Sequence, residues 1–361
     1  MSIRALSAIA IAFVVVGMQA GKAEARTVVV GSDATCQDSI KERYATIQAA
    51  VNASAIGGTV LVCPGTYPEQ VVLSMPLIIK GVNNPASNGS SAVVTVPAAG
   101  LAPNASNGNV AQIVVQGFTG GQAQIVNLIV DGSGGGCSQG PTSGIKLLNV
   151  GDATWTSSAG VVSGVVVRNE CGDAVNAENS FITVQNSIMH DVGLNGITTN
   201  GGDTLINNNT MHNINIWGVS VTAGVNSVVS NNVLASQRGI NVDGGSTGVQ
   251  VTTNTIGPYT GTAILAQYSS GLNIKSNKVH GAYAGVWLYQ VSGSMVMSNT
   301  LSNLYGFGIV DEASHAGNTI QNNVLTEMPK GIVTYNSDLA GDIVTPNTFN
   351  QVDVMNTNTL W

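Results

Sequence analysis

The chain has 361 residues, of which only 9% are charged, and its 12 Lys and Arg residues are outnumbered by 19 Asp and Glu residues. Because nucleic-acid binding requires clustered Lys and Arg side chains that neutralise phosphates, this composition argues against a nucleic-acid partner. Gly is abundant, and so low a charged fraction is unlike an ordinary helical enzyme, whose surface is clothed in long charged side chains.

Residues 1–25 have the pattern of a cleaved secretory signal peptide. Arg4 gives a positive start, an apolar run follows at residues 5–18, and a small-x-small site ends at Ala25. The run is short for a membrane span, although an uncleaved anchor is the alternative. We therefore expect cleavage near Ala25 and a secreted or periplasmic mature protein with no transmembrane segment. Its ten basic and 18 acidic residues give a net charge of −8.

Residues 26–58 are predicted to form an N-terminal cap with a short amphipathic helix. Thr46 is suited to be its N-cap, and Ile47, Ala50 and Val51 form an apolar stripe. A repetitive β structure leaves an open strand edge at each end, which a helix of this kind can cover.

Residues 59–361 are predicted to form the repetitive body and a C-terminal tail. Two glycines at residues 57 and 58 end the helix, and TVLV opens the first strand. Apolar segments beginning at Pro76, Ile113 and Ala123 are predicted to be early turns of the repeat. The polar, low-complexity residues 83–109 are predicted to be a long loop around one turn.

The chain contains four cysteines, Cys36, Cys63, Cys137 and Cys171. An even number in an exported protein indicates disulfides. Three pairings are possible, and we favour the pairing of neighbours, Cys36 with Cys63 and Cys137 with Cys171. A four-cysteine metal site is the alternative, but no C-x-x-C spacing supports it.

The later part of the sequence repeats itself in steps of 21 to 24 residues. A small residue followed by Ile or Val recurs at Ala174-Val175, Gly196-Ile197, Gly218-Val219, Gly239-Ile240, Ala263-Ile264, Gly285-Val286, Gly308-Ile309 and Gly331-Ile332. A second column consists only of Asn, at Asn209, Asn232, Asn254, Asn277, Asn299, Asn323 and Asn347. Self-similarity at a fixed period of this length is the signature of a solenoid.

Each repeat contains short apolar–polar alternations rich in β-branched residues, which predicts two or three short strands per turn. The sequence therefore predicts an all-β, single-domain parallel β-helix, with roughly a dozen turns and a length of about 60 Å. Side chains at one position of successive turns stack about 4.8 Å apart, so the Asn column can hydrogen-bond along the axis. We interpret that column as structural.

The segment YATIQAAVNASAIGGTVLVCPGTYPEQVVL, from Tyr44 to Leu73, resembles the opening of right-handed parallel β-helix proteins of the pectin-lyase-like superfamily. With the downstream repeats, the resemblance covers nearly the whole mature chain and implies a right-handed coil. It implies no single function, because members include lyases, hydrolases, esterases, epimerases, adhesins and periplasmic maturation factors.

The catalytic signatures of polygalacturonases, pectinesterases and pectate lyases are missing from the sequence. Alginate-type epimerases and lyases use Tyr, Asp and His. The segment from Tyr305 to His315 contains these residue types without the compact D-P-H motif. No specific activity can therefore be transferred from the family.

Strand alternation predicts which side chains face outward on the repeated strands. Trp287, Tyr289 and Tyr335 are expected on one face, beside Glu312 and within a few turns of Asp243. Aromatic faces stack on sugar rings, and carboxylates hydrogen-bond hydroxyl groups, so these five residues are candidates for polysaccharide binding. The alternative is that a loop or the C-terminal tail covers the aromatic residues.

Asp311 follows an outward position and is expected to point inward, where a carboxylate is costly unless it is paired or protonated. It could belong to a polar site with Glu312 and His315 that supplies a general base and acid. The alternative is a turn that begins at Asp311.

His190 and His212 occupy matching positions one turn apart, and Asp191 is adjacent to the first. Two imidazoles about 4.8 Å apart at Cα could bind one metal ion. The column continues with Ala235, however, so two ordinary surface histidines are the alternative.

From Gly160 onward the chain has five basic residues against twelve acidic ones. A densely anionic polysaccharide would be repelled unless Ca²⁺ bridged it to carboxylates such as Asp243 and Glu312; a neutral glycan avoids the problem. We predict an exported protein that binds or modifies a polysaccharide on an outward strand face, in the manner of a lyase, hydrolase or epimerase. If it is an enzyme, we expect a polysaccharide lyase or a glycoside hydrolase. The alternatives are a non-catalytic envelope scaffold or adhesin, and a periplasmic metal-handling factor.

Overall fold

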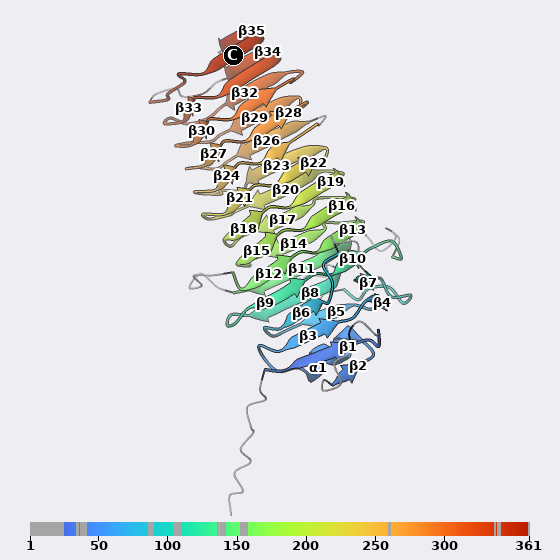
Figure 1. Cartoon of the computed structure of the whole chain (residues 1–361). Coiled ribbons are helices and arrows are strands. Elements are labelled where there is room, and N and C mark those ends of the chain that lie inside the picture. The colour runs from blue at the N-terminus through green and yellow to red at the C-terminus, as the bar shows by residue number, and fades with distance from the viewer. Residues whose placement is uncertain are drawn as a thin grey trace, which may run out of the picture.

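The computed structural model describes residues 25–33, 36, 42–85, 90–103, 110–135, 137, 142–151, 158–258, 261–335, 337 and 341–359. The expected signal peptide lies outside these residues except for Ala25. The described chain forms a parallel β-solenoid of about 12 turns, and a single helix lies at its N-terminal end (Figure 1).

Each turn contributes one strand to each of three parallel sheets, which we call the side, front and back sheets in the order in which the chain visits them. The back sheet consists of β2 (Arg43–Tyr44), β1 (Thr27–Val30), β3 (Thr59–Val62), β6 (Ile78–Gly81), β9 (Ala123–Val126), β12 (Gly160–Ser163), β15 (Ile182–Gln185), β18 (Thr204–Asn207), β21 (Val228–Ser230), β24 (Gln250–Thr252), β27 (Asn273–Lys275), β30 (Met295–Met297) and β33 (Thr319–Gln321).

The side sheet consists of β4 (Gly65–Pro68), β7 (Ala92–Thr95), β10 (Ile129–Asp131), β13 (Val166–Glu170), β16 (Ile188–Val192), β19 (Thr210–Ile214), β22 (Val233–Ala235), β25 (Thr255–Ile256), β28 (Lys278–His280) and β31 (Thr300–Ser302). The front sheet consists of β5 (Val71–Leu73), β8 (Val110–Phe118), β11 (Thr142–Val150), β14 (Val175–Glu178), β17 (Ile197–Asn200), β20 (Trp217–Thr222), β23 (Arg238–Asp243), β26 (Thr262–Gln267), β29 (Ala284–Tyr289) and β32 (Phe307–Glu312). The long strands β34 (Val324–Tyr335) and β35 (Thr348–Thr359) continue both sheets.

The Asn column forms the predicted internal ladder at the corner between the back and side sheets. The Nδ2 of Asn254, for example, donates to the Oδ1 of Asn277 at 3.0 Å and to the backbone oxygen of Val229 at 2.9 Å. The same pattern runs from Asn209 to Asn347. These amides are buried but satisfied, because each turn supplies the partner of the next.

The repeated small residue lies at the corner between the side and front sheets, where a side chain would enter the interior. A Cβ atom on Gly285 would lie 2.6 Å from the backbone oxygen of Gly308, which is closer than real Cβ contacts. The strand register skips this position: Trp217 pairs with Arg238 and Val219 with Ile240. Two successive residues therefore face inward, and the residue before the small one is turned outward.

The N-terminal segment confirms the predicted helix and adds a strand. Helix α1 (Ile47–Ala53) begins at its N-cap Thr46, whose side chain accepts from the backbone N–H of Ala49, and it buries Ile47, Ala50 and Val51. The helix ends before the glycines expected to stop it. Strand β1 pairs in parallel with β3, so the solenoid sheet already begins at Thr27.

The structure also decides the expected loop at residues 83–109 and the pairing of the cysteines. The segment 83–109 is not wholly a loop, because β7 lies within it and pairs with β4 and β10. Both favoured disulfides are present, Cys36–Cys63 and Cys137–Cys171, and no cysteine of the described chain is free.

Candidate functional site

The predicted outward columns of the front sheet are in register. Trp287 pairs with Leu265 and Val310, while Glu312 lies between Tyr289 and Tyr335. Trp287, Tyr289, Glu312 and Tyr335 are all partly exposed. The backbone of residues 356–359 continues β35 beside β34, while the last two residues of the expected tail lie outside the described residues.

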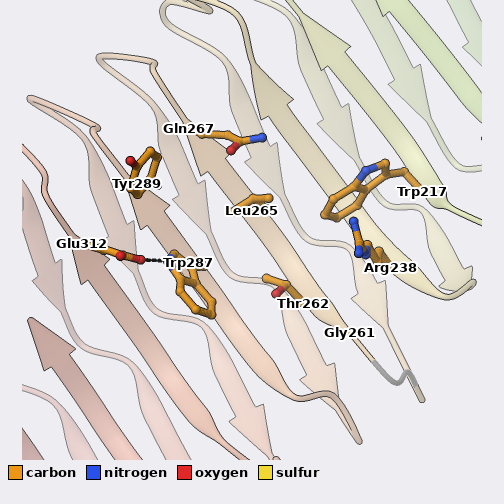
Figure 2. A pocket seen from close by; sticks show the side chains of 9 residues that line it. All are labelled: Trp217, Arg238, Gly261, Thr262, Leu265, Gln267, Trp287, Tyr289 and Glu312. Carbon is orange, nitrogen blue, oxygen red and sulfur yellow. Dashed lines mark hydrogen bonds between the residues drawn. The ribbon is translucent and has the colours of Figure 1, made fainter. Parts of the chain in front are cut away.

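These strands carry a groove of about 420 Å³ (Figure 2). Trp217 and Arg238 line one end, Trp287 and Glu312 line the other, and Leu265 lies between them. Because β20 and β29 are three turns apart, the backbones that carry the two indole rings are separated along the axis by about 14 Å. The groove thus has two aromatic walls and an apolar floor.

A hydrogen bond fixes one wall of the groove. The indole Nε1 of Trp287 donates to Oε2 of Glu312 over 2.9 Å, and both side chains are partly buried. A bond to an ionised acceptor is stronger than one between neutral groups, so it orients the indole ring. The other carboxylate oxygen of Glu312 makes no hydrogen bond to the described residues, and it can accept one from a ligand.

Trp217 and Arg238 form the opposite wall, and sequence reasoning missed both. The guanidinium carbon of Arg238 lies 5.3 Å from the centre of the Trp217 ring, a cation–π contact. Strict alternation places these residues inside the solenoid, whereas the corner at the small residue turns them outward. The signal that could have found them was their position directly before Gly218 and Gly239.

The other long edge of the groove is polar. Gln267 donates through Nε2 to Oδ2 of Asp243 at 3.2 Å, and both side chains are partly exposed. Tyr289 lies one turn further and meets Tyr268 edge to face, with 5.4 Å between ring centres. Asp243 therefore borders the groove through Gln267, and Tyr335 lies beyond Glu312, outside the lining residues.

The structure does not assemble Asp311, Glu312 and His315 into one site. Asp311 is fully buried between Leu288 and Thr334, as alternation predicts, whereas Glu312 faces the groove and His315 is exposed. Among the described residues, neither carboxylate oxygen of Asp311 has a partner in good hydrogen-bond geometry. Burial raises its pKa to about 6, and the nearby hydroxyls offset this only in part.

His190 and His212 stack face to face, with ring centres 5.0 Å apart and planes 6° from parallel. The carboxylate of Asp191 is already engaged: Oδ2 contacts Nδ1 of His190 at 2.6 Å, and Oδ1 accepts from Asn213. Among the described residues, no three His, Cys, Asp or Glu side chains are grouped to hold a metal ion. The arrangement lends the predicted metal site no support.

A second polar cluster lies on the front sheet nearer the N-terminus. Lys146 is almost fully buried, and its ammonium donates to Oδ1 of Asn176 at 2.7 Å and pairs with Glu178. The amide of Asn176 in turn donates to Oδ2 of Asp173. Each of these polar side chains thus has a partner within the network.

These features define an all-β parallel solenoid with an aromatic-lined groove on one sheet. Two overlapping matches to the family model described as "right handed beta helix region", at residues 143–298 and 195–349, together span more than half of the chain. The chain belongs to that family, and its fold is that of the right-handed pectin-lyase-like proteins, as the resemblance implied. None of the curated protein sequences matches it.

Several solved structures have a similar fold. The A-module of the mannuronan C-5 epimerase AlgE6 of Azotobacter vinelandii is 17% identical; the alignment covers 87% of this chain and 93% of the module, with a TM-score of 0.60. A mutant of the periplasmic alginate epimerase AlgG is 12% identical, with 84% and 77% covered and a TM-score of 0.52. At such identities, the likeness shows the fold alone. Within the described residues, no helix is long and apolar enough to cross a membrane.

Proposed function

We propose that the groove of the front sheet binds a segment of a polysaccharide. The observation that carries this proposal is the Trp287–Glu312 pair, an indole held by a hydrogen bond beside a carboxylate oxygen that is still able to accept. A sugar ring presents an apolar face that stacks on an aromatic ring and a rim of hydroxyl groups that need acceptors. The Trp287–Glu312 pair offers a stacking face and a hydrogen-bond acceptor side by side.

The extent of the groove supports a polymer rather than a single sugar. The walls at Trp217 and Trp287 lie on strands three turns apart, and Leu265 between them gives an apolar surface. Gln267 adds an amide that can donate and accept along the same edge. Stacking surfaces repeated along one direction suit a chain of several sugars.

Glu312 is the group in the groove that could exchange a proton with a bound sugar, as lyases and glycoside hydrolases require. Asp311 cannot serve as its partner from inside the solenoid. Similar folds occur in epimerases named for mannuronan and alginate, which is compatible with modification of a polysaccharide. The disulfides fit an oxidising compartment, so the proposed site of action is the periplasm or the outside of the cell.

Binding can be tested by titrating the purified protein with neutral and acidic polysaccharides, with and without Ca²⁺, in a calorimeter. We expect at least one of them to bind, and Trp287→Ala to weaken that affinity by at least about tenfold. Met295→Ala, an exposed residue on the back sheet, is the matched control and should leave affinity unchanged. Equal loss in both variants, or no binding at all by folded protein, would refute the proposal.

Modification is tested separately on the polymers that bind. Ultraviolet absorbance reports unsaturated ends, and a reducing-sugar assay reports hydrolysis. Product that disappears in Glu312→Gln, with binding retained, would make the groove an active site. Binding without product in either assay would exclude lyase and hydrolase activity. If nuclear magnetic resonance also showed no change in sugar configuration, which is the only trace an epimerase leaves, the groove would belong to a binding protein such as a surface adhesin or scaffold.

A further inference from the structure

The two long edges of the groove differ in charge. The edge column at the start of the front strands reads Trp217, Arg238, Thr262, Ala284, Phe307 and Lys330 in successive turns. The column at the other edge includes the carboxylates Asp243 and Glu312. The first edge thus holds two of the five basic residues that follow Gly160, and the second edge is acidic.

Arg238 and Lys330, the two cations on the first edge, each lie over an aromatic ring of the preceding turn. The guanidinium of Arg238 lies 5.3 Å from the ring centre of Trp217, and the ammonium of Lys330 lies 5.2 Å from that of Phe307. In each pair the aromatic ring is one turn before the cation in the same column. A ring that supports the flexible stem of a Lys or Arg holds its charge in place.

The two pairs are four turns apart, and the intervening positions of the column, Thr262 and Ala284, are uncharged. At the inter-strand spacing this separates the cations by about 19 Å, roughly the length of four sugars in an extended chain. Phe307 also contacts Trp287, with 6.2 Å between ring centres, so the second pair is continuous with the groove.

We propose that the ligand of the groove is a sparsely charged acidic heteropolysaccharide, with one carboxylate in each repeat of about four sugars, whose successive carboxylates meet Arg238 and Lys330. This inference rests on the proposed function and narrows its substrate class. A polymer with a carboxylate on every sugar would place unpaired anions over Thr262 and Ala284 and close to the acidic edge. Like charges so placed repel, which favours the sparse polymer.

The test uses gellan, deacylated and cut to short chains, because it carries one glucuronate in each four-sugar repeat. Its carboxyl-reduced form is the uncharged match, and polyguluronate is the densely charged comparison. We expect the wild-type protein to bind gellan about tenfold or more tightly than either. Arg238→Gln and Lys330→Gln should each weaken gellan binding and reduce its salt dependence, and the loss should be larger for gellan than for the reduced polymer.

Lys278→Gln, an exposed cation on the side sheet, is the control and should bind gellan as the wild type does. If reduced gellan binds as tightly as native gellan, the inference is wrong while the proposed function stands. If polyguluronate binds more tightly than gellan and depends on the same two cations, the spacing argument is wrong. If no polymer binds, and Trp287→Ala behaves as the wild type, the proposed function itself fails.

Discussion

The Asn ladder and the front sheet solve the same problem in opposite ways. In the ladder, the same side chain recurs at every turn, and every buried amide finds its partner in the next copy. In the front sheet, each turn carries a different residue, and Asp311 is buried without a well-aligned hydrogen-bond partner among the described residues. Repetition therefore supplies each buried amide with a partner in the next turn and a carbonyl of the back sheet. Variation along the front sheet instead places different functional groups side by side.

The strongest way to test this contrast is to break the ladder in its middle. Asn277→Ala removes the acceptor of Asn254 and the amide that bonds to Val251 and Asn299. Several buried polar groups then lose their partners, and we expect unfolding to cost about 3–5 kcal/mol less free energy. Urea denaturation followed by circular dichroism measures the loss. A change below about 1 kcal/mol would mean that water replaces the amide, and the ladder would not be the main restraint.

The next largest expected effect is a dependence of stability on pH that arises from Asp311. Its folded-state pKa of about 6 lies above its ordinary value of 3.8, so the folded protein binds more protons than the unfolded chain between these values. Stability from this group is therefore full below pH 3.8 and falls as pH rises to about 6, by up to about 3 kcal/mol. Asp311→Asn should remove this slope and make the variant more stable than wild type at pH 7.

Asp131 shows that hydrogen-bond partners can reverse the direction in which burial shifts the pKa of a carboxyl group. Burial raises its pKa, but hydrogen bonds from Asn169, Ser133 and Arg168 outweigh burial and lower the pKa to about 2. Stability from Asp131 is thus lost only as pH falls below 3.8. Asp131 is present in both wild type and Asp311→Asn, so its contribution cancels when the unfolding free energies of the two proteins are subtracted. A difference that does not vary between pH 3.5 and 7 would contradict the account of Asp311.

A smaller effect is expected for the second aromatic wall of the groove. Trp217→Ala removes the stacking face and the support of Arg238, and we expect polysaccharide affinity to fall about tenfold. Because the Trp217 side chain is buried, stability will fall as well, so the affinity is measured on protein that circular dichroism shows to be folded. Leu205→Ala, exposed on the back sheet, serves as the control. Affinity that is unchanged in calorimetry would confine the ligand to the end of the groove at Trp287.

The smallest effect is predicted next to the ladder. Asn208 is exposed, adopts a φ of 54°, and donates to Oδ1 of Asn186 at 2.7 Å. Asn208→Gly keeps this backbone conformation without strain and loses only a solvent-exposed bond, so we expect a change below about 1 kcal/mol. If Asn208→Gly lowered the free energy of unfolding as much as Asn277→Ala does, burial would not explain why the ladder contributes more stability than the exposed Asn208–Asn186 contact.

Periodicity predicted most of the fold, because a residue that recurs every 22 or so positions must stack. The Asn ladder, the outward register of Trp287 and Glu312, and the inward side chain of Asp311 all follow from it. Strands β1 and β7 pair with neighbouring strands, but they were missed because their residues do not belong to the repeated sequence pattern. Trp217 and Arg238 were missed because alternation fails at the corner glycine, where backbone crowding, rather than hydrophobicity, decides the direction.

The uniform register of the front sheet has a consequence for how such a molecule can change. Each turn meets its neighbours through the same backbone pairing, so a whole turn could be gained or lost between Arg238 and Lys330 without disturbing the rest. One event of that kind would lengthen or shorten the distance between the two cations by about 4.8 Å, close to one sugar. Duplication or deletion of single turns would thus adjust ligand preference in discrete steps.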